Sequence, residues 1–232
     1  LADLNGNTAE FRMSEDRAFL EAMNQKMASS LFYGTDKNEF VGLAPRFSEH
    51  SGLDDTQSAY NVIDGGGSGN TNTSIWVVCW SPQTVHGIYP KHSKAGFSHD
   101  DLGQVTLIDA DGGKYEGYRS HYMWEMGLTV RDPRYVSRIC NVDVSLLGGQ
   151  SAADLVDLLI DATERIPTPE MGRTVIYCNR TIRTVLRKQM LQATNMNLTL
   201  DTVAGKKVVK FDEFPVRRCD RILNTEATVS SV

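Results

Sequence analysis

Residues 112–143 decide how this chain is interpreted, and they read GGKYEGYRSHYMWEMGLTVRDPRYVSRICNVD. Aromatic and β-branched residues recur along the segment, which is typical of extended strands. The turn sequence Asp111-Gly112-Gly113 at its start predicts a β-hairpin. The segment holds no set of side chains arranged for catalysis. We therefore expect strands that lie flat against a neighbouring protein surface.

A charged cluster lies inside this segment, and a second one follows about eighty residues later. Two interpretations stay open. The charges form exposed ion pairs, each of which contributes little, or they pair between subunits, because the planar guanidinium group suits carboxylates at interfaces. Under the second interpretation, the subunit-interface candidates are Arg131, Asp132, Arg134, Arg138, Arg217 and Arg218.

Upstream, residues 8–33 are predicted to form one long helix. Acidic residues occupy its first half, where the helix dipole favours them. An apolar stripe at four-residue spacing marks one face, and Gly34 is placed to end the helix. The stripe consists of Phe19, Met23, Met27 and Leu31. Residues 35–72 are rich in loop signals, and 65–70 form a glycine-rich loop. Short strands are predicted at 74–80, 85–89 and 105–108.

Downstream, the sequence predicts an α/β unit. Ser151 is the expected N-cap of a helix that Pro167 stops, and a buried strand follows at 174–178. Asn179 is the expected N-cap of a second helix that extends to about Leu191. Residues 203–209 are predicted to form a hairpin.

The composition is that of an ordinary globular protein, with 232 residues, 41% hydrophobic residues and a net charge of −5. This charge argues against a dedicated nucleic-acid-binding protein. No apolar run is long enough to span a membrane, and no signal peptide opens the sequence. The four cysteines are widely separated and stand mostly among apolar residues, so we expect buried, reduced thiols.

The strongest candidate for chemistry is a loop-rich stretch with His86, His92, His99, Asp100 and Asp101. Imidazole and carboxylate groups are ligands for zinc and other divalent metals. Histidines in such a stretch are usually polar loop residues, and this is our interpretation. A metal-dependent hydrolase that uses His86, His92, His99 and Asp100 is the alternative. We expect no metal, no cofactor and no enzyme activity.

In constant order, segments along nearly the whole chain resemble the major capsid proteins of short-tailed double-stranded DNA bacteriophages. The resemblance is more specific than a short motif because it covers so much of the sequence. Its segments are LADLNGNTAEFRMSEDRAFLEAMNQKMASSLFYG (1–34), GLAPRF (42–47), TSIWVVCW (73–80), VHGIYPKHSKAGFSHDDLG (85–103), residues 112–143 and RRCDRILNTEA (217–227).

The resemblance implies an α+β protein of the Hong Kong-type capsid fold, with a long spine helix, a peripheral β-sheet and an axial α/β domain. Residues 1–71 are then a peripheral-type domain with the spine helix at 8–33, and 113–146 are long peripheral strands. Residues 72–112 form a β-rich segment of the axial domain, and 147–232 are its α/β part. The family's N-terminal arm and extended loop are expected to be absent from this chain. The strands come before the axial helices, which implies a reordered connectivity.

The function implied by the resemblance is structural. The chain is expected to assemble with copies of itself into pentamers and hexamers of an icosahedral phage head. Scaffolding, portal and decoration proteins are the implied partners, and packaged double-stranded DNA is enclosed without specific contact. The implied location is the virion, assembled in the cytoplasm of the bacterial host, with no membrane partner.

Overall fold

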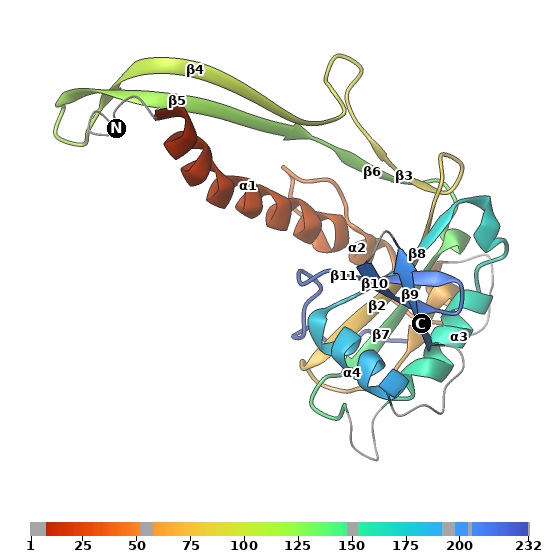
Figure 1. Ribbon diagram of the computed structural model, residues 1–232. Coiled ribbons are helices and arrows are strands. Elements are labelled where there is room, and N and C mark those ends of the chain that lie inside the picture. Colours follow the sequence, from red (N-terminus) through yellow and green to blue (C-terminus); the bar gives the residue numbers. More distant parts are fainter. Residues whose placement is uncertain (1–7, 52–57, 148–152, 192–197, 204–205, 232) are drawn as a thin grey trace. The chain divides into compact units, whose positions relative to one another are not determined.

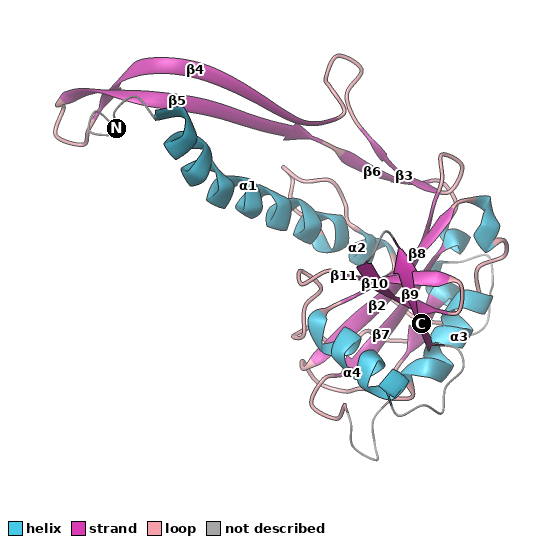
Figure 2. Cartoon of the chain, viewed as in Figure 1, coloured by secondary structure: helices cyan, strands magenta, loops and turns pink. Residues whose placement is uncertain are grey.

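The computed structural model describes residues 8–51, 58–147, 153–191, 198–203 and 206–231. The chain divides into two compact units, which we describe separately. The α/β unit contains residues 1–86 and 130–232, and the hairpin unit contains residues 87–129. The hairpin unit is therefore an insertion between two sequence halves of the α/β unit (Figures 1 and 2).

Among the described residues, nine strands form one mixed sheet. Its main path runs in the order β1, β7, β2, β8, β11, β10, β9, and β3 pairs with β2 and β6. The strands are β1 (Val62–Asp64), β2 (Asn72–Trp80), β3 (Val85–Ile88), β6 (Gly127–Val130), β7 (Val136–Asp143), β8 (Arg173–Cys178), β9 (Leu198–Val203), β10 (Lys206–Phe211) and β11 (Phe214–Arg218).

Strand β2 is the centre of this sheet. Its sequence, NTSIWVVCW, is buried from its first residue to its eighth, as expected for a strand covered on both faces. β2 pairs antiparallel with both β7 and β8. One extra residue in β7 forms a bulge opposite Thr73 and Ile75, where Asn141 adopts φ +54°. Asparagine tolerates this left-handed conformation better than most residues.

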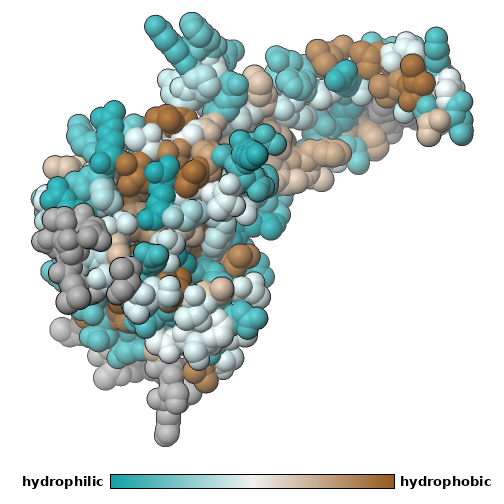
Figure 3. Space-filling view, turned by 180° about the vertical axis from the view of Figure 1, so that it is seen from behind, coloured by the Kyte–Doolittle hydropathy of each residue, from teal (hydrophilic) through white to brown (hydrophobic). Residues whose placement is uncertain are grey.

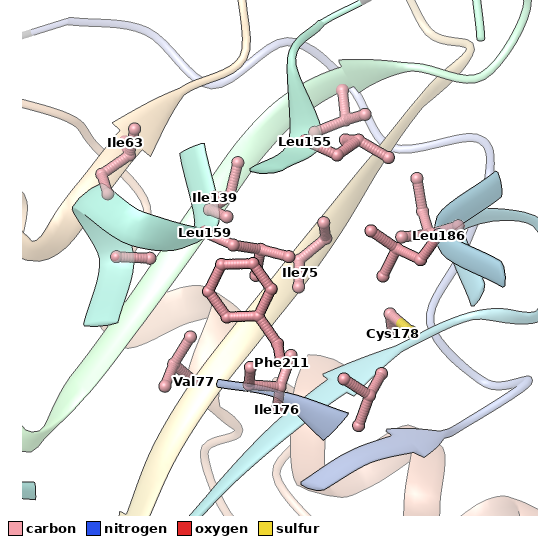
Figure 4. Packing of buried hydrophobic residues seen from close by; sticks show 14 of the residues in the cluster. Ile63, Ile75, Val77, Ile139, Leu155, Leu159, Ile176, Cys178, Leu186 and Phe211 are labelled. Atoms are coloured by element: carbon pink, nitrogen blue, oxygen red, sulfur yellow. The ribbon is translucent and has the colours of Figure 1, made fainter. Parts of the chain in front are cut away.

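One face of the sheet carries the main hydrophobic core (Figure 4). Ile75 and Val77 of β2 meet Leu155 and Leu159 of α3 (Leu155–Glu164), and Leu186 of α4 (Arg180–Leu191) joins the same cluster. Within the unit, α3 packs on β7, whereas α4 packs on β11 and β9. The two helices therefore cover opposite halves of the same face.

The last turn of α1 (Thr8–Tyr33) and the short helix α2 (Leu43–Arg46) pack on the other face of the sheet. Trp76 is the central residue of this layer. Its ring centroid lies 5.9 Å from that of Phe32 in α1 and 6.2 Å from that of Phe47, the residue that follows α2. Both phenylalanines are 1% exposed.

The predicted long helix at 8–33 is present as α1, and its 26 residues extend for about 39 Å. The predicted apolar stripe is only partly covered. Phe19 is 65% exposed, and burial is concentrated in the last turn at Ser30 and Phe32. Among the described helices, none combines the length and apolar character needed to span a membrane.

The hairpin unit consists mainly of β4 (Gly96–Ile108) and β5 (Lys114–Glu125), which pair antiparallel along nearly their whole length. The predicted turn before residue 114 is present, since Asp109 accepts hydrogen bonds from the backbone amides of Asp111 and Gly113. A register shift between Asp101 and Gln104 places Gly103 at φ +70°.

Three expectations need correction. Residues 112–143 do not form one sheet, because β5 belongs to the two-stranded ribbon with β4, whereas β6 and β7 belong to the nine-stranded sheet. Residues 96–104 are strand and not loop, since a ribbon exposed on both faces needs no apolar alternation. The cap of α3 is Asp154, whereas Ser151 lies outside the described residues.

The second helix begins as predicted, because Asn179 accepts a hydrogen bond from the amide of Ile182 at 3.0 Å. The four cysteines are not in disulfide bonds, and the predicted burial is seen at three of them. Cys79, Cys140 and Cys178 are buried and unpaired, and Cys219 is half-buried. Burial raises the pKa of the Cys140 and Cys178 thiols to about 12.

Candidate functional site

The main polar site of the α/β unit is a buried ion pair between Arg138 and Glu226. The Arg138 Nη2 atom lies 2.8 Å from Glu226 Oε2, and the two side chains are 5% and 6% exposed. Arg138 also donates to Ser74 Oγ at 3.0 Å and to the carbonyl of Phe47 at 2.7 Å. Its guanidinium lies 5.0 Å from the centre of the Trp76 ring. A buried charge needs this degree of hydrogen bonding to offset its desolvation.

Tyr33, the last residue of α1, belongs to the same network. Its hydroxyl donates to the Glu226 carboxylate and accepts from the amide of Leu223 at 3.0 Å. Burial and the neighbouring carboxylate raise the pKa of Tyr33 far above its ordinary value. The network therefore joins the end of α1 and strands β2 and β7 to residues 222–231, which we call the strap.

The strap is held at a second point by the bulge in β7. The Asn141 side chain accepts a hydrogen bond from the backbone amide of Val229 at 2.8 Å and donates one to the Val229 carbonyl at 3.0 Å. It also donates to the Asp64 carboxylate at 2.8 Å. The unusual backbone conformation of Asn141 thus points an amide group at the strap, and no sequence pattern indicated this role.

Arg138, which the sequence analysis placed among the interface candidates, is buried within the α/β unit. Its side chain is occupied within the subunit and is not available to a neighbour. Sequence reasoning placed it with Arg131 and Arg134 because the three are close in sequence. Its partner Glu226 lies 88 residues further on, and no local pattern connects the two.

The remaining predicted interface residues lie at the surface. Arg131 is exposed. The Asp132 carboxylate accepts a hydrogen bond from the backbone amide of Arg134 at 3.0 Å, and Asp132 thereby caps the short helix η2 (Pro133–Tyr135). The Arg134 guanidinium pairs with the same carboxylate at 2.8 Å and holds the pKa of Asp132 below its ordinary value. Arg131 is therefore the exposed member of this group that these contacts do not involve.

The second predicted group lies at the end of β11. Arg217 and Arg218 are exposed there, and Asp220 pairs with Arg218 at 3.3 Å and with Arg180 at 2.9 Å. An open pocket of about 560 Å³ adjoins this group, on the side of α1. It is lined by Glu21, Asn24, Gln25, Ala28, Arg180, Arg218, Cys219, Asp220 and Arg221.

The structure gives no support to the alternative of a metal-dependent hydrolase. His86 belongs to β3, His92 lies in the loop after β3, and His99 and Asp100 belong to β4. His99 stacks on the Tyr122 ring at 4.6 Å, as in an ordinary cross-strand contact. Within the described part of the chain, no three His, Cys, Asp or Glu side chains are grouped to hold a metal.

The hairpin unit exposes many large apolar side chains, which are visible on the ribbon in the space-filling view (Figure 3). Phe97 stacks on Tyr122 at 5.4 Å, and Trp124 lies opposite Phe97 on the same face. The exposed members are Ile88, Tyr89, Phe97, Leu102, Ile108, Tyr115, Tyr118 and Met123. A surface of this kind is typical of a segment that contacts other protein.

This chain, with its long helix, covered mixed sheet and exposed β-ribbon, has matches among known proteins. A family model described as major capsid protein GP7 matches residues 1–230. The chain belongs to this family of phage major capsid proteins. A chain in the near-atomic-resolution structure of bacteriophage epsilon15 is similar to it, with 36% sequence identity and a TM-score of 0.69. The alignment covers 98% of this chain and 70% of that chain. Among curated proteins, none matches.

The predicted resemblance and the α+β capsid fold are thereby confirmed. A major capsid protein is a structural component of the virion, so the family assigns the chain a structural role.

Proposed function

We propose that this major capsid protein assembles into pentamers and hexamers of an icosahedral phage head that encloses double-stranded DNA. The observation that supports this most is the family match along residues 1–230. Subunits that meet through two different surfaces close into rings, and rings of five and six tile a shell. Each contact can be weak because every subunit makes several of them.

Two features of the chain fit this role. The hairpin unit exposes apolar side chains along both strands, as a segment would that is covered only after assembly. The net charge of −5 also suits a container, because a wall that adheres to DNA would hinder its packing. In this proposal the head assembles in the host cytoplasm, together with scaffolding, portal and decoration proteins.

We assign α1 and the hairpin unit to the peripheral part of the subunit, and the sheet with α3 and α4 to the axial part. Arg131, Asp132, Arg134, Arg217 and Arg218 remain proposed interface residues. Charge reversal of Arg131 and Arg217, which are exposed, is expected to reduce assembly without unfolding the subunit.

Electron microscopy of the capsid protein, expressed together with the scaffolding protein of the same phage, tests the proposal. Closed shells with five-fold and six-fold clusters are the expected result. Subunits that stay monomeric at high concentration with the scaffolding protein present would overturn it.

A further inference from the structure

Helix α3 carries an acidic stripe on its exposed side. Asp157, Asp161 and Glu164 are all exposed, and their spacing of four and three residues places them on one helix face. The helix sequence LVDLLIDATE contains no basic residue. Ile160, between these acids, is a large apolar side chain that is 37% exposed. An apolar side chain surrounded by charges resembles the centre and rim of a protein interface.

Helix α4 carries a basic stripe of the same length. Arg180, Arg183 and Arg187 follow one another at spacings of three and four residues, and the exposed Lys188 adjoins them. The helix sequence RTIRTVLRKQML contains no acidic residue. Residues 157–164 and 180–187 each rise by about 10.5 Å along their helix axes, so the two stripes match in length.

Neither stripe is explained by the isolated subunit. Glu164 lies at the C-terminal end of α3 and Arg180 at the N-terminal end of α4, the ends at which the helix dipole disfavours these charges. Like charges four residues apart, as in Asp157 and Asp161, also destabilise a helix. In the described part of the chain, Arg180 alone among the stripe residues has an ion-pair partner, Asp220. The Nε atom of Arg183 is buried with no hydrogen-bond partner there.

The two stripes are not paired with each other in the described part of the subunit. The helices cover opposite halves of the sheet face, since α3 packs on β7 whereas α4 packs on β11 and β9. The described residues contain no ion pair between the two helices. An acidic surface on one helix and a basic surface on another give each copy the two complementary surfaces that head-to-tail contact between identical copies requires.

We propose that α3 of one subunit docks against α4 of a second copy of this chain, and that repetition of this contact closes each ring of the shell. The inference rests on the proposed function and names the surfaces that carry it out. Asp157, Asp161 and Glu164 pair with Arg183, Arg187 and Lys188 of the next subunit, around Ile160 at the centre.

Charge reversal of either stripe tests the contact. The α3 variant is Asp161→Lys with Glu164→Lys, and the α4 variant is Arg187→Glu with Lys188→Glu. Each variant is expected to lower the yield of closed shells roughly tenfold, measured by sedimentation and electron microscopy, because like charges then face each other at every contact. The variant with all four changes restores opposite charges and is expected to recover most of the yield.

The control variant is Lys37→Glu with Glu49→Lys, two exposed residues outside both stripes, which is expected to assemble like the wild type. Circular dichroism and thermal unfolding establish that each variant folds. If wild-type protein forms no shells, the proposed function fails. If wild type forms shells and both double variants assemble equally well, this contact is wrong and the proposed function stands.

A crosslinking measurement keeps the test independent of charge. Ile160→Cys and Thr184→Cys place one thiol in the middle of each stripe, at exposed positions on α3 and α4. In assembled shells, a short bis-maleimide is expected to produce a ladder of linked subunits up to pentamers and hexamers. Either single variant, with the natural cysteines unchanged, is expected to give no ladder. A doubly substituted protein that assembles but shows no crosslinks between subunits would refute the contact.

Discussion

The α/β unit packs Trp76, Phe32 and Phe47 on one face of its sheet and a larger aliphatic cluster on the other, whereas the hairpin unit buries only Leu128 along residues 87–129. A two-stranded ribbon without such a core is marginally stable by itself in water. The difference shows that one part of the subunit carries its own folding free energy. The hairpin unit is expected to be stabilised by contact with other protein surfaces.

The largest effect is expected from the buried ion pair. Arg138→Met leaves the Glu226 carboxylate buried without its partner, and the free energy of unfolding of the α/β unit should fall by about 3–5 kcal/mol. Urea unfolding followed by fluorescence of Trp76 and Trp80 measures this loss, in a background where Trp124 of the hairpin is replaced by phenylalanine. Adding Glu226→Leu removes the stranded charge and should recover part of the loss. A single variant as stable as wild type would contradict the assignment of this pair to the core.

The same hydrophobic truncation in the two units makes the comparison direct. Leu159→Ala removes a fully buried side chain of α3 and should lower the free energy of unfolding by about 2–5 kcal/mol. Leu102→Ala truncates a hairpin side chain that is 49% exposed and should change it by less than about 0.5 kcal/mol. Equal effects of the two changes on the isolated subunit would mean that the hairpin has a core of its own.

Alkaline pH should destabilise the α/β unit selectively, because it contains all four cysteines. The Cys140 and Cys178 thiols have a pKa of about 12 in the folded protein, against 9.0 for an ordinary thiol. The unfolded state therefore loses its protons first. The stability that this difference contributes is complete below pH 9.0 and is lost as the pH rises towards 12. Each thiol should lower the free energy of unfolding by up to about 1.4 kcal/mol per pH unit.

Urea titrations at several alkaline pH values measure this slope. The variant with Cys140→Ala and Cys178→Ala is the matched control. It is less stable throughout, but its stability should decline more gently between pH 9 and 12. Parallel slopes for wild type and variant would show that these thiols do not govern the alkaline response.

The smallest effect is expected at the exposed ion pair of the α/β unit. Arg134→Ala removes the partner of Asp132, and since the Arg134 side chain is 54% exposed, the loss should stay below about 0.5 kcal/mol. Thermal unfolding of this variant and of Arg138→Met compares an exposed and a buried arginine of the same unit. It shows whether burial sets the contribution of an arginine to stability. A loss at Arg134 that equals the loss at Arg138 would break that rule.

Much of the fold could be predicted from the sequence because its signals are local. The helix at 8–33, the cap at Asn179 and the turn at 109–113 each depend on residues within a few positions of one another. The resemblance to phage capsid proteins was likewise carried by contiguous segments. Features of this kind can be predicted without knowledge of tertiary contacts.

The rest depends on pairs of residues far apart in sequence. Nothing near Arg138 indicates that its partner is Glu226, so the buried arginine was grouped with exposed ones. The strand at 96–104 was missed because an exposed ribbon lacks the alternation that marks a half-buried strand. The charge stripes of α3 and α4 become meaningful only when the sheet places the two helices on separate halves.

The network around Glu226 also bears on the order of events during synthesis. Ser74 and Arg138 leave the ribosome well before residue 226, so the nascent sheet holds an arginine side chain whose counter-charge does not yet exist. Until the strap arrives, the sheet face around Trp76 stays incompletely closed, and Tyr33 has no carboxylate to bind. We therefore expect the subunit to complete its fold only after the strap has been translated, so that a partly made chain lacks the finished surfaces through which it would join its neighbours.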